Sequence, residues 1–442
     1  MKVKIDLEKA AAFLDKDRLT ARKEEAAAIC RELFTRIDTE QVLGWRDRET
    51  SAVQLELIKA KAEEIRREAD VFIIVGVGGS NQASRAMIKA LAEDDKPQIL
   101  YLGNTLSPHY INKVLKKMEG KSVYFNVIAK NFETLEPGSH FRILRHWMAA
   151  RYSEAETAKR IIVTGSPGSR SEQIADQNGY LFLPFPPSVG GRYSVFSPVC
   201  LFPVTVAGLD TDAYLAGMEA ARADIGGNPG NNLAVDYAAA RNLLYQQGYD
   251  IEMLAVFEPQ YACFTRWWVQ MFGETEGKDG KGIFPAGAVY SEDLHAIGQY
   301  MQEGRRNLLE TFLSVTDPGD SLTVEADPEA DDGFAYLDGK DFREINRAAE
   351  EATWKAHSEG GVPCLRIEVD AISEATFGAL YYYFITACVI SATLMGVNPF
   401  NQDGVEAYKK SMFRALGKQP GKYDKNSSCS NDRNGYKLRS EK

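Results

Sequence analysis

An arginine directly follows two glycines in the stretch PPSVGGRYSVFSP, residues 186–198. Arg192 carries a charge that does not titrate near neutral pH, and Gly190 and Gly191 place no side chain beside it. The stretch can be a turn that ends in a solvated charge. It can also be a backbone left open so that a small anion can approach the main chain and the guanidinium together.

Two glutamates lie close together in GETEG, and the residue type allows Glu274 or Glu276 to move a proton. Each could equally be a solvated loop acid, and we expect Glu276 to be one. His295, in SEDLHAIGQY, titrates near neutral pH and suits acid–base exchange, although a single helical histidine is often structural. Ser291 is the expected N-cap of its helix.

Two lysines are adjacent at the end of NPFNQDGVEAYKK, residues 398–410. Lys410 lies four residues after Glu406, the spacing of an ordinary ion pair on a helix surface. Residue type alone therefore does not choose between Lys409 and Lys410 as a chemical group.

A glycine-rich loop, GVGGS, follows the apolar run VFIIV and precedes a helical pattern. A strand, a glycine loop and a helix in this order direct backbone N–H groups at an anion. The loop lacks the GxGxxG spacing of dinucleotide sites and the lysine of a Walker motif, which disfavours NAD and ATP. A plain turn would explain the same glycines.

These loops need a scaffold, and short continuous apolar runs alternate with helical patterns along the chain. Buried parallel strands in βαβ units have this texture. We expect strands within residues 71–80, 99–105, 123–130, 160–166, 251–259, 308–315 and 364–370. The predicted class is α/β, with two doubly wound parallel-sheet domains of three αβα layers and extra helices.

The change of texture suggests where these domains begin and end. We place a small α/β domain at residues 66–186 and a large α/β domain at residues 1–65 plus 187–420. The remaining residues, 421–442, are polar with few apolar anchors, so we predict a disordered tail.

Composition excludes several classes of partner and cofactor. The net charge of −10 leaves no basic surplus for nucleic acid or for an anionic membrane. The six cysteines form no CxxC pair and the five histidines show no metal-ligand spacing, so we expect no metal, no cofactor and reduced thiols in a cytoplasm. The N-terminus lacks a signal-peptide pattern, and we do not expect export.

One long uncharged stretch, residues 375–402, is long enough to span a bilayer. Its three consecutive tyrosines, its hydroxyl groups and its lack of a basic flank favour a buried core helix instead.

The GGRYS loop resembles the first signature of the phosphoglucose isomerases, in which this loop faces the sugar. NPFNQDGVEAYKK is similar to the second signature, with Gln402, Val405, Glu406 and Lys409 in the matching positions. Further similarity to the short bacterial form runs through WWVQMFGETEGKDGKGIFP and DLHAIGQYMQEGRR, so the resemblance covers about residues 65–418. It implies two domains of the sugar isomerase type.

The resemblance also implies a role for each candidate. Glu274 matches the family's proton-transferring glutamate, and Arg192 would stabilise the charge of an enediolate beside the open backbone at Gly191. His295 and Lys409 would open the sugar ring, with His295 donated by the other subunit of a homodimer. Gln270 and Gln402 match positions that touch the sugar, although a buried glutamine can equally serve a backbone carbonyl.

The phosphate-binding loops depart from the family pattern. The first, GGSNQASR, keeps Gly79 and Ser80, but the expected Leu-Gly pair is replaced by QA. The second reads AKNFETLEP, where Lys130 and Thr134 match while Ala129, Asn131 and Glu133 replace hydroxyl residues. A lost hydrogen bond to a charged group removes roughly 1.5 to 3 kcal/mol, and a carboxylate facing a phosphate adds repulsion. Alternatively, Glu133 points away and Asn131 with backbone N–H groups suffices for the phosphate.

The resemblance, together with these residue types, implies an aldose–ketose isomerase of glycolysis and gluconeogenesis. It would interconvert glucose 6-phosphate and fructose 6-phosphate through a cis-enediol(ate), without metal or cofactor. One alternative is a divergent paralogue that isomerises another sugar or sugar phosphate. The other is a non-catalytic sugar-phosphate sensor, which the presence of the acid–base residues disfavours.

Overall fold

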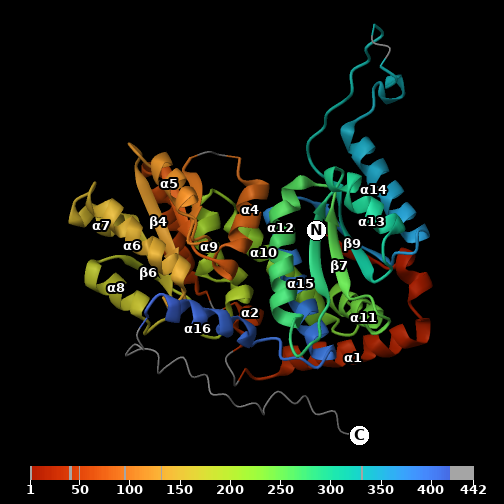
Figure 1. Cartoon of the computed structure of the whole chain (residues 1–442), viewed down its shortest axis with the longest axis horizontal. Helices are drawn as coiled ribbons and strands as arrows, with labels where there is room; N and C mark the ends of the chain where they lie inside the picture. Colours follow the sequence, from red (N-terminus) through yellow and green to blue (C-terminus); the bar gives the residue numbers. More distant parts are fainter. Residues whose placement is uncertain are drawn as a thin grey trace.

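The structure is a computed structural model that describes residues 2–38, 42–48, 50–93, 96–130, 132–329 and 332–418. Two five-stranded sheets lie side by side, each flanked by helices (Figure 1). The α/β class with doubly wound sheets is confirmed. The predicted tail, residues 421–442, lies outside the described residues.

The first sheet has the strand order β3-β2-β4-β5-β6, and all its pairings are parallel. Its strands are β2 (Val71–Val75), β3 (Gln98–Leu102), β4 (Val123–Ile128), β5 (Ile161–Gly165) and β6 (Leu181–Pro184). The four early apolar runs form β2 to β5 as predicted, while β6 was not predicted. The strand order reverses at β2, which is where open α/β sheets bind ligands beyond the carboxyl ends of their strands.

Both faces of this small sheet are covered, which explains its continuous apolar runs. Phe72 and Ile74 of β2 join the core shared with α3 (Ala52–Glu68), α4 (Gln82–Leu91) and α9 (Pro198–Val206). The alternating residues Val71, Ile73 and Val75 join a second core with α5 (Pro108–Lys117), α6 (Leu135–Ala149) and α8 (Arg170–Asn178). Successive side chains of a strand point to opposite faces, so a strand buried on both sides is apolar along nearly its whole length. The polar exceptions Asn126 and Thr164 are hydrogen-bonded to each other at 3.0 Å.

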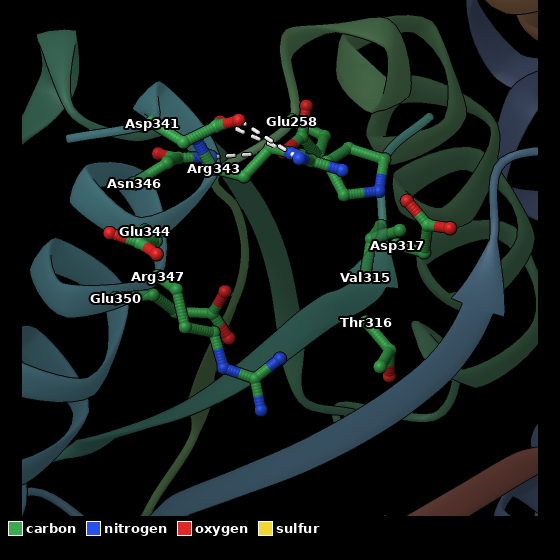
Figure 2. A pocket seen from close by; sticks show the side chains of 11 residues that line it. Glu258, Val315, Thr316, Asp317, Asp341, Arg343, Glu344, Asn346, Arg347 and Glu350 are labelled. Carbon is green, nitrogen blue, oxygen red and sulfur yellow. Dashed lines mark hydrogen bonds and ion pairs between the residues drawn. The ribbon is translucent and has the colours of Figure 1, made fainter. Parts of the chain in front are cut away.

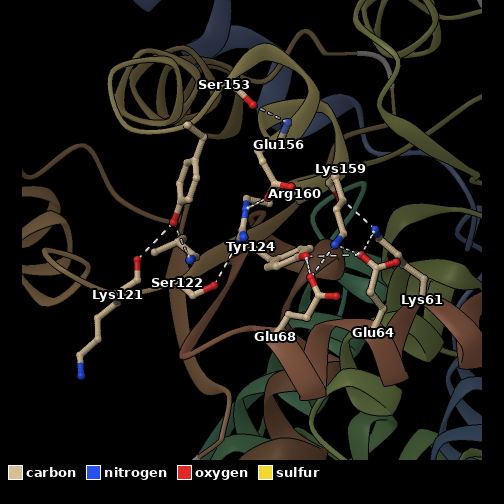
Figure 3. A network of polar contacts seen from close by, with 12 residues as sticks. Lys61, Glu64, Glu68, Lys121, Ser122, Tyr124, Ser153, Glu156, Lys159 and Arg160 are labelled. Carbon is tan, nitrogen blue, oxygen red and sulfur yellow. Dashed lines mark hydrogen bonds and ion pairs between the residues drawn. The ribbon is translucent and has the colours of Figure 1, made fainter.

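Polar contacts fasten α3 to this sheet (Figure 3). Glu68 accepts hydrogen bonds from the Tyr124 hydroxyl of β4 at 2.7 Å and from the Lys159 ammonium of α7 (Glu154–Arg160) at 2.6 Å. The domain boundary at residue 65 remains a prediction, and α3 runs across it while packing on the small sheet.

The second sheet has the order β1-β10-β9-β7-β8, with β1 antiparallel to β10 and the other pairings parallel. Its strands are β1 (Val3–Asp6), β7 (Ile251–Val256), β8 (Phe284–Val289), β9 (Leu308–Asp317) and β10 (Cys364–Ala371). The three later apolar runs form β7, β9 and β10 as predicted. β1 and β8 were not predicted, because β1 alternates charged and apolar residues and β8 contains proline and glycine.

Helices cover both faces of the large sheet as well. Leu254 and Val256 share a core with α1 (Lys16–Thr35), α11 (Leu233–Gln246) and α15 (Glu374–Leu394). Ala255 and Phe312 share another with α13 (Ile297–Glu303) and α14 (Phe342–Glu359). The remaining helices are α2 (Gly44–Asp47), α10 (Thr211–Gly227), α12 (Ala262–Glu276) and α16 (Glu406–Ala415).

The uncharged stretch forms α15, which is long and apolar enough to cross a membrane, yet 89% of its most apolar window is buried inside the molecule. The hydroxyls of its three tyrosines reach different neighbours. Tyr381 donates to the Ala83 carbonyl, Tyr382 to the Arg46 carbonyl and Tyr383 to the Asp224 carboxylate. The prediction of a buried core helix is confirmed.

Candidate active site

Arg192 lies in a short 3₁₀ helix, Gly191–Phe196, that follows the small sheet. Its side chain is only 3% exposed. Nε donates to the Thr275 hydroxyl at 2.8 Å, one terminal nitrogen to Glu274 at 2.8 Å, and the other to the carbonyls of Pro399 and Asn401. A solvated charge at the end of a turn is therefore not what the structure contains.

Glu274 lies in the last turn of α12 and faces Arg192. Its Oε1 accepts the guanidinium bond, and its Oε2 accepts a 3.1 Å bond from Nε2 of Gln270, one helical turn earlier. The Glu274 side chain is 15% exposed, so it is mostly buried but still accessible to solvent. Both carboxylate oxygens are thus held in place, as the positioning of a general base requires.

Burial lowers the pKa of the Arg192 guanidinium, but the neighbouring Tyr193 and Glu274 outweigh this effect and raise it above its ordinary value. The Tyr193 hydroxyl also donates to the Pro399 carbonyl, at 2.8 Å. Arginine is already protonated at any physiological pH, so the positive charge at this position is permanent.

The expectation that Glu276 is a solvated loop acid was wrong. Glu276 is fully buried and receives two bonds from the guanidinium of Arg241, which is also bonded to Glu252. α12 extends through residue 276, and positions two apart on a helix point about 200° away from each other. Glu274 therefore faces the site while Glu276 faces the core.

Two glycine loops from different parts of the chain meet beside this pair. A Cβ atom on Gly79 would lie 2.0 Å from the carbonyl oxygen of Gly191, so only glycine allows the approach. Gly78 has φ +56°, and a Cβ there would lie 2.9 Å from Nε2 of Gln270. A Cβ on Gly191 would meet nothing within 4 Å. The loop after β2 is thereby joined to the residues that hold Arg192 and Glu274.

The described members of the predicted phosphate-binding set, Gly79, Ser80, Lys130 and Thr134, follow the carboxyl ends of β2 and β4, where the strand order reverses. Ser80 ends the short 3₁₀ helix Gly78–Ser80, and the Lys130 ammonium donates to the carbonyls of Pro187 and Val189 at 3.2 and 2.9 Å. Thr134 is the exposed N-cap residue of α6, and Glu133 is exposed beside it. Asn131 lies outside the described residues.

The other predicted residues are not all brought to Glu274. His295 ends the 3₁₀ helix Glu292–His295 and is exposed, and Gln402 is exposed. Within the part of the chain that the structure describes, no hydrogen bond or ion pair joins either side chain to Arg192 or Glu274. Lys409 is half-buried on α16, drawn in blue in Figure 1. The Asn401 carbonyl next to Gln402 is bonded to Arg192 at 3.1 Å.

Sequence reasoning missed Thr275 and Tyr193 as supports of Arg192. Both lie beside residues that had been singled out, but their direction depends on the turn of each helix. Sequence reasoning also assigned no role to Lys278. Nothing in the sequence of residues 398–401 indicates that the carbonyls of this loop contact the guanidinium of Arg192. Among the described residues, no group of three or more His, Cys, Asp or Glu side chains is placed to hold a metal ion.

A separate pocket of about 360 Å³ lies at the carboxyl ends of β7 and β9, where the order of the large sheet reverses (Figure 2). Its charged lining consists of Glu258, Asp317, Asp341, Arg343, Glu344, Arg347 and Glu350. Burial raises the pKa of both Glu258 and Glu350. The pocket contains no predicted site residue, and the strand order that creates it cannot be read from the sequence.

Comparison with solved structures identifies the fold. A hypothetical protein from Thermus thermophilus matches with a TM-score of 0.84 at 24% identity, covering 94% of this chain and all of that one. A glucose-6-phosphate isomerase from Chlamydia trachomatis matches with a TM-score of 0.78 at 17% identity, covering 94% of this chain and 88% of that one.

Sequence comparison identifies the family. The chain is 42% identical over 386 residues to a glucose-6-phosphate isomerase of Staphylococcus saprophyticus, covering 85% of this chain and 87% of the relative. It is 40% identical over 434 residues to one of Bacillus cereus, covering 95% and 96%. The family model described as phosphoglucose isomerase matches residues 63–436. The chain belongs to the phosphoglucose isomerase family.

Proposed function

We propose that this protein is an aldose–ketose isomerase that interconverts glucose 6-phosphate and fructose 6-phosphate, a step of glycolysis and gluconeogenesis. The observation that carries the proposal is the sheltered pair of Glu274 and Arg192, 2.8 Å apart. The pair lies next to a glycine loop at the reversal point of the small sheet. Relatives at about 40% identity, named glucose-6-phosphate isomerase, support the same reaction.

In the proposed mechanism, Glu274 takes a proton from the carbon beside the carbonyl and returns it to the neighbouring carbon. The intermediate is a cis-enediol(ate), so one carboxylate on one face serves both transfers. Four of the five N–H groups of Arg192 already donate to protein atoms. An enediolate oxygen would take the fifth, on the same nitrogen that binds Glu274, and would meet a donor that needs no reorganisation.

The sugar must open before it isomerises, and we assign this step to His295 and Lys409. The sugar hydroxyls would be oriented by Gln270, by Gln402 and by the open backbone at Gly191. The phosphate would lie against Gly79, Ser80, Lys130, Asn131 and Thr134. The N-terminus of α6 supports this placement, because its Thr134 N-cap makes no side-chain capping bond in the described chain and the helix dipole favours an anion.

The experiment is a coupled isomerase assay on both hexose 6-phosphates in the presence of a metal chelator, comparing the natural protein with Glu274→Gln. Glutamine keeps the shape and cannot accept the proton, so we expect kcat to fall by about 10³-fold, within the range of general base catalysis. Glu63→Gln makes the same chemical change at an exposed position of α3 and should be neutral. Full activity of Glu274→Gln would refute the mechanism.

We also propose a cytoplasmic homodimer in which His295 enters the site of the partner subunit. His295 is exposed on its own subunit, and the arm between β9 and α14 projects from the molecule with Leu322, Phe334 and Tyr336 exposed (Figure 1). Exposed apolar side chains on a projecting segment favour an interface with another chain. Unpaired cysteines among the described residues fit a reducing compartment.

Mixing two inactive variants tests the shared site. If His295 acts across the interface, a dimer of Glu274→Gln with His295→Ala contains one intact site and one doubly altered site. Random reassortment should then restore about a quarter of the natural activity in a two-fold symmetric dimer. If the mixture stays as inactive as its components after subunit exchange is verified, His295 does not act across the interface.

A further inference from the structure

Lys278 follows α12 by two residues and turns back toward the candidate site. Its ammonium donates to the carbonyl oxygen of Asn398 at 2.5 Å. The residue is half-buried, although lysine is normally a solvated surface residue. Glu274, at the end of α12, is only four residues earlier, so one short segment carries both side chains.

The carbonyl of Asn398 belongs to an irregular loop, residues 398–401, that links the region after α15 to Gln402. Three side chains hold the carbonyls of this loop: Lys278 at Asn398, Tyr193 and Arg192 at Pro399, and Arg192 again at Asn401. Carbonyls in a loop without regular structure need donors from elsewhere. The shape of the loop is therefore set by groups of the candidate active site.

Lys278 is the one of these donors whose charge can change near physiological pH. Burial and, after it, repulsion from Arg192 lower the pKa of Lys278 to about 8. Attraction from the carboxylates of Glu274 and Asp403 offsets part of this effect. Below this pH the ammonium donates a charge-assisted hydrogen bond, and above it the bond weakens as the charge is lost.

We propose that Lys278 is a positioning residue of the isomerase reaction, whose ammonium holds the 398–401 loop against Arg192 and so places Gln402 and the segment that carries Lys409. The kinetic consequences of this inference rest on the proposed function. The position of the loop rests on the hydrogen bonds alone.

Lys281 provides a matched comparison three residues later. Its ammonium donates to the Met395 carbonyl at 2.9 Å, at the end of α15. Among the described residues, no hydrogen bond joins its side chain to Arg192 or to the 398–401 loop. A lysine at this helix end stabilises the fold by satisfying a terminal carbonyl. Lys281→Met therefore removes the same chemical group and leaves the hydrogen bond between Lys278 and Asn398 in place.

The experiment measures kcat, KM, pH dependence and amide hydrogen exchange for the natural protein, Lys278→Met, Lys278→Arg and Lys281→Met. We expect Lys278→Met to lower kcat at least about tenfold and to raise KM by less than that, because Gln402 is displaced while the phosphate-side residues stay in place. Exchange of the amides of residues 397–402 should accelerate in Lys278→Met and not in Lys281→Met.

The Lys278→Arg variant distinguishes a role for the positive charge of Lys278 from a role in packing alone. A guanidinium remains protonated above pH 8, so Lys278→Arg should recover activity and move the basic limb of the kcat profile to higher pH. A Lys278→Met enzyme within twofold of natural activity would overturn the proposal, as would a loss that arginine does not repair or an unchanged basic limb. Hydrogen exchange tests the position of the loop without any assay of activity. Unchanged exchange of residues 397–402 in Lys278→Met would overturn the proposal for Lys278. Inactivity of the natural protein on both sugars would instead refute the proposed function.

Discussion

The two halves of the candidate site are built differently. On the catalytic side, the Arg192 side chain is 3% exposed and donates to four protein acceptors, while Glu274 is held from two directions. On the phosphate side, Glu133 and Thr134 are exposed on a loop. A group that must meet charge developing in a transition state gains from being fixed in advance, whereas a dianion can be held by flexible donors and a helix end.

Because the catalytic side chains have more hydrogen-bond partners than those on the phosphate side, we expect substitutions on the two sides to have different effects. Each charge-assisted bond of Arg192 is worth roughly 1.5 to 3 kcal/mol, and the buried acceptors it satisfies would be left unpaired without it. Changes on the catalytic side should therefore affect kcat and folding together. Changes on the exposed phosphate side should affect KM and leave folding nearly unaltered.

The largest effect in this comparison is expected from Arg192→Lys. A lysine keeps the charge but cannot donate at once to Thr275, Glu274 and the loop carbonyls, because it lacks the planar fork. We expect kcat to fall by about 10² to 10³-fold, the range for loss of an oxyanion-stabilising donor, with a lower melting temperature. Steady-state kinetics and calorimetry measure both.

A matched control for this change is Arg222→Lys, at a position whose side chain is 41% exposed and forms surface ion pairs. Such pairs contribute about 0 to 1 kcal/mol, so activity and melting temperature should stay close to natural values. If Arg192→Lys were as mild as this control, the catalytic half would not be the rigid part of the site.

The smallest effect is expected from Glu133→Thr, which restores a hydroxyl of the family pattern on the phosphate side. Removing an exposed carboxylate near the phosphate should lower KM for both hexose 6-phosphates by about two- to fivefold, because solvent and salt screen the repulsion. kcat should not change. Kinetics at low and high salt would show the gain shrinking as screening increases.

Glu119→Thr makes the same substitution at another exposed position and serves as the control. An increase in KM for Glu133→Thr would mean that Glu133 contributes to substrate binding, and the altered loop would then be an adaptation to a different sugar.

Much of the scaffold was predictable, because a strand that is buried on both faces appears in the sequence as a nearly continuous apolar run. VFIIV is apolar at every position and VYFNVI at every position but Asn126, and the two runs form β2 and β4. β8 was missed because its sequence, FPAGAV, carries the proline and glycine that normally end strands. β1 was missed because a short edge strand alternates its exposure and resembles other surface segments.

The candidate site was predictable only in part. The types and motifs of Arg192 and Glu274 singled them out, and both lie in one polar cluster. Glu276 was misjudged, because its proximity in sequence to Glu274 says nothing about which side of α12 it occupies. Lys278 and the 398–401 carbonyls could not be found, since their partners are more than a hundred residues away along the chain.

The sequence by itself determined the alternation of buried strands and helices, the glycine positions and the permanent charge of Arg192, because each depends on residue type and local spacing. Only the tertiary structure decided which strands are neighbours, which glutamate faces the site and which lysine meets the loop after α15. These features depend on how segments distant in the chain pack together, and the order of strands at β2 and β7 sets that arrangement.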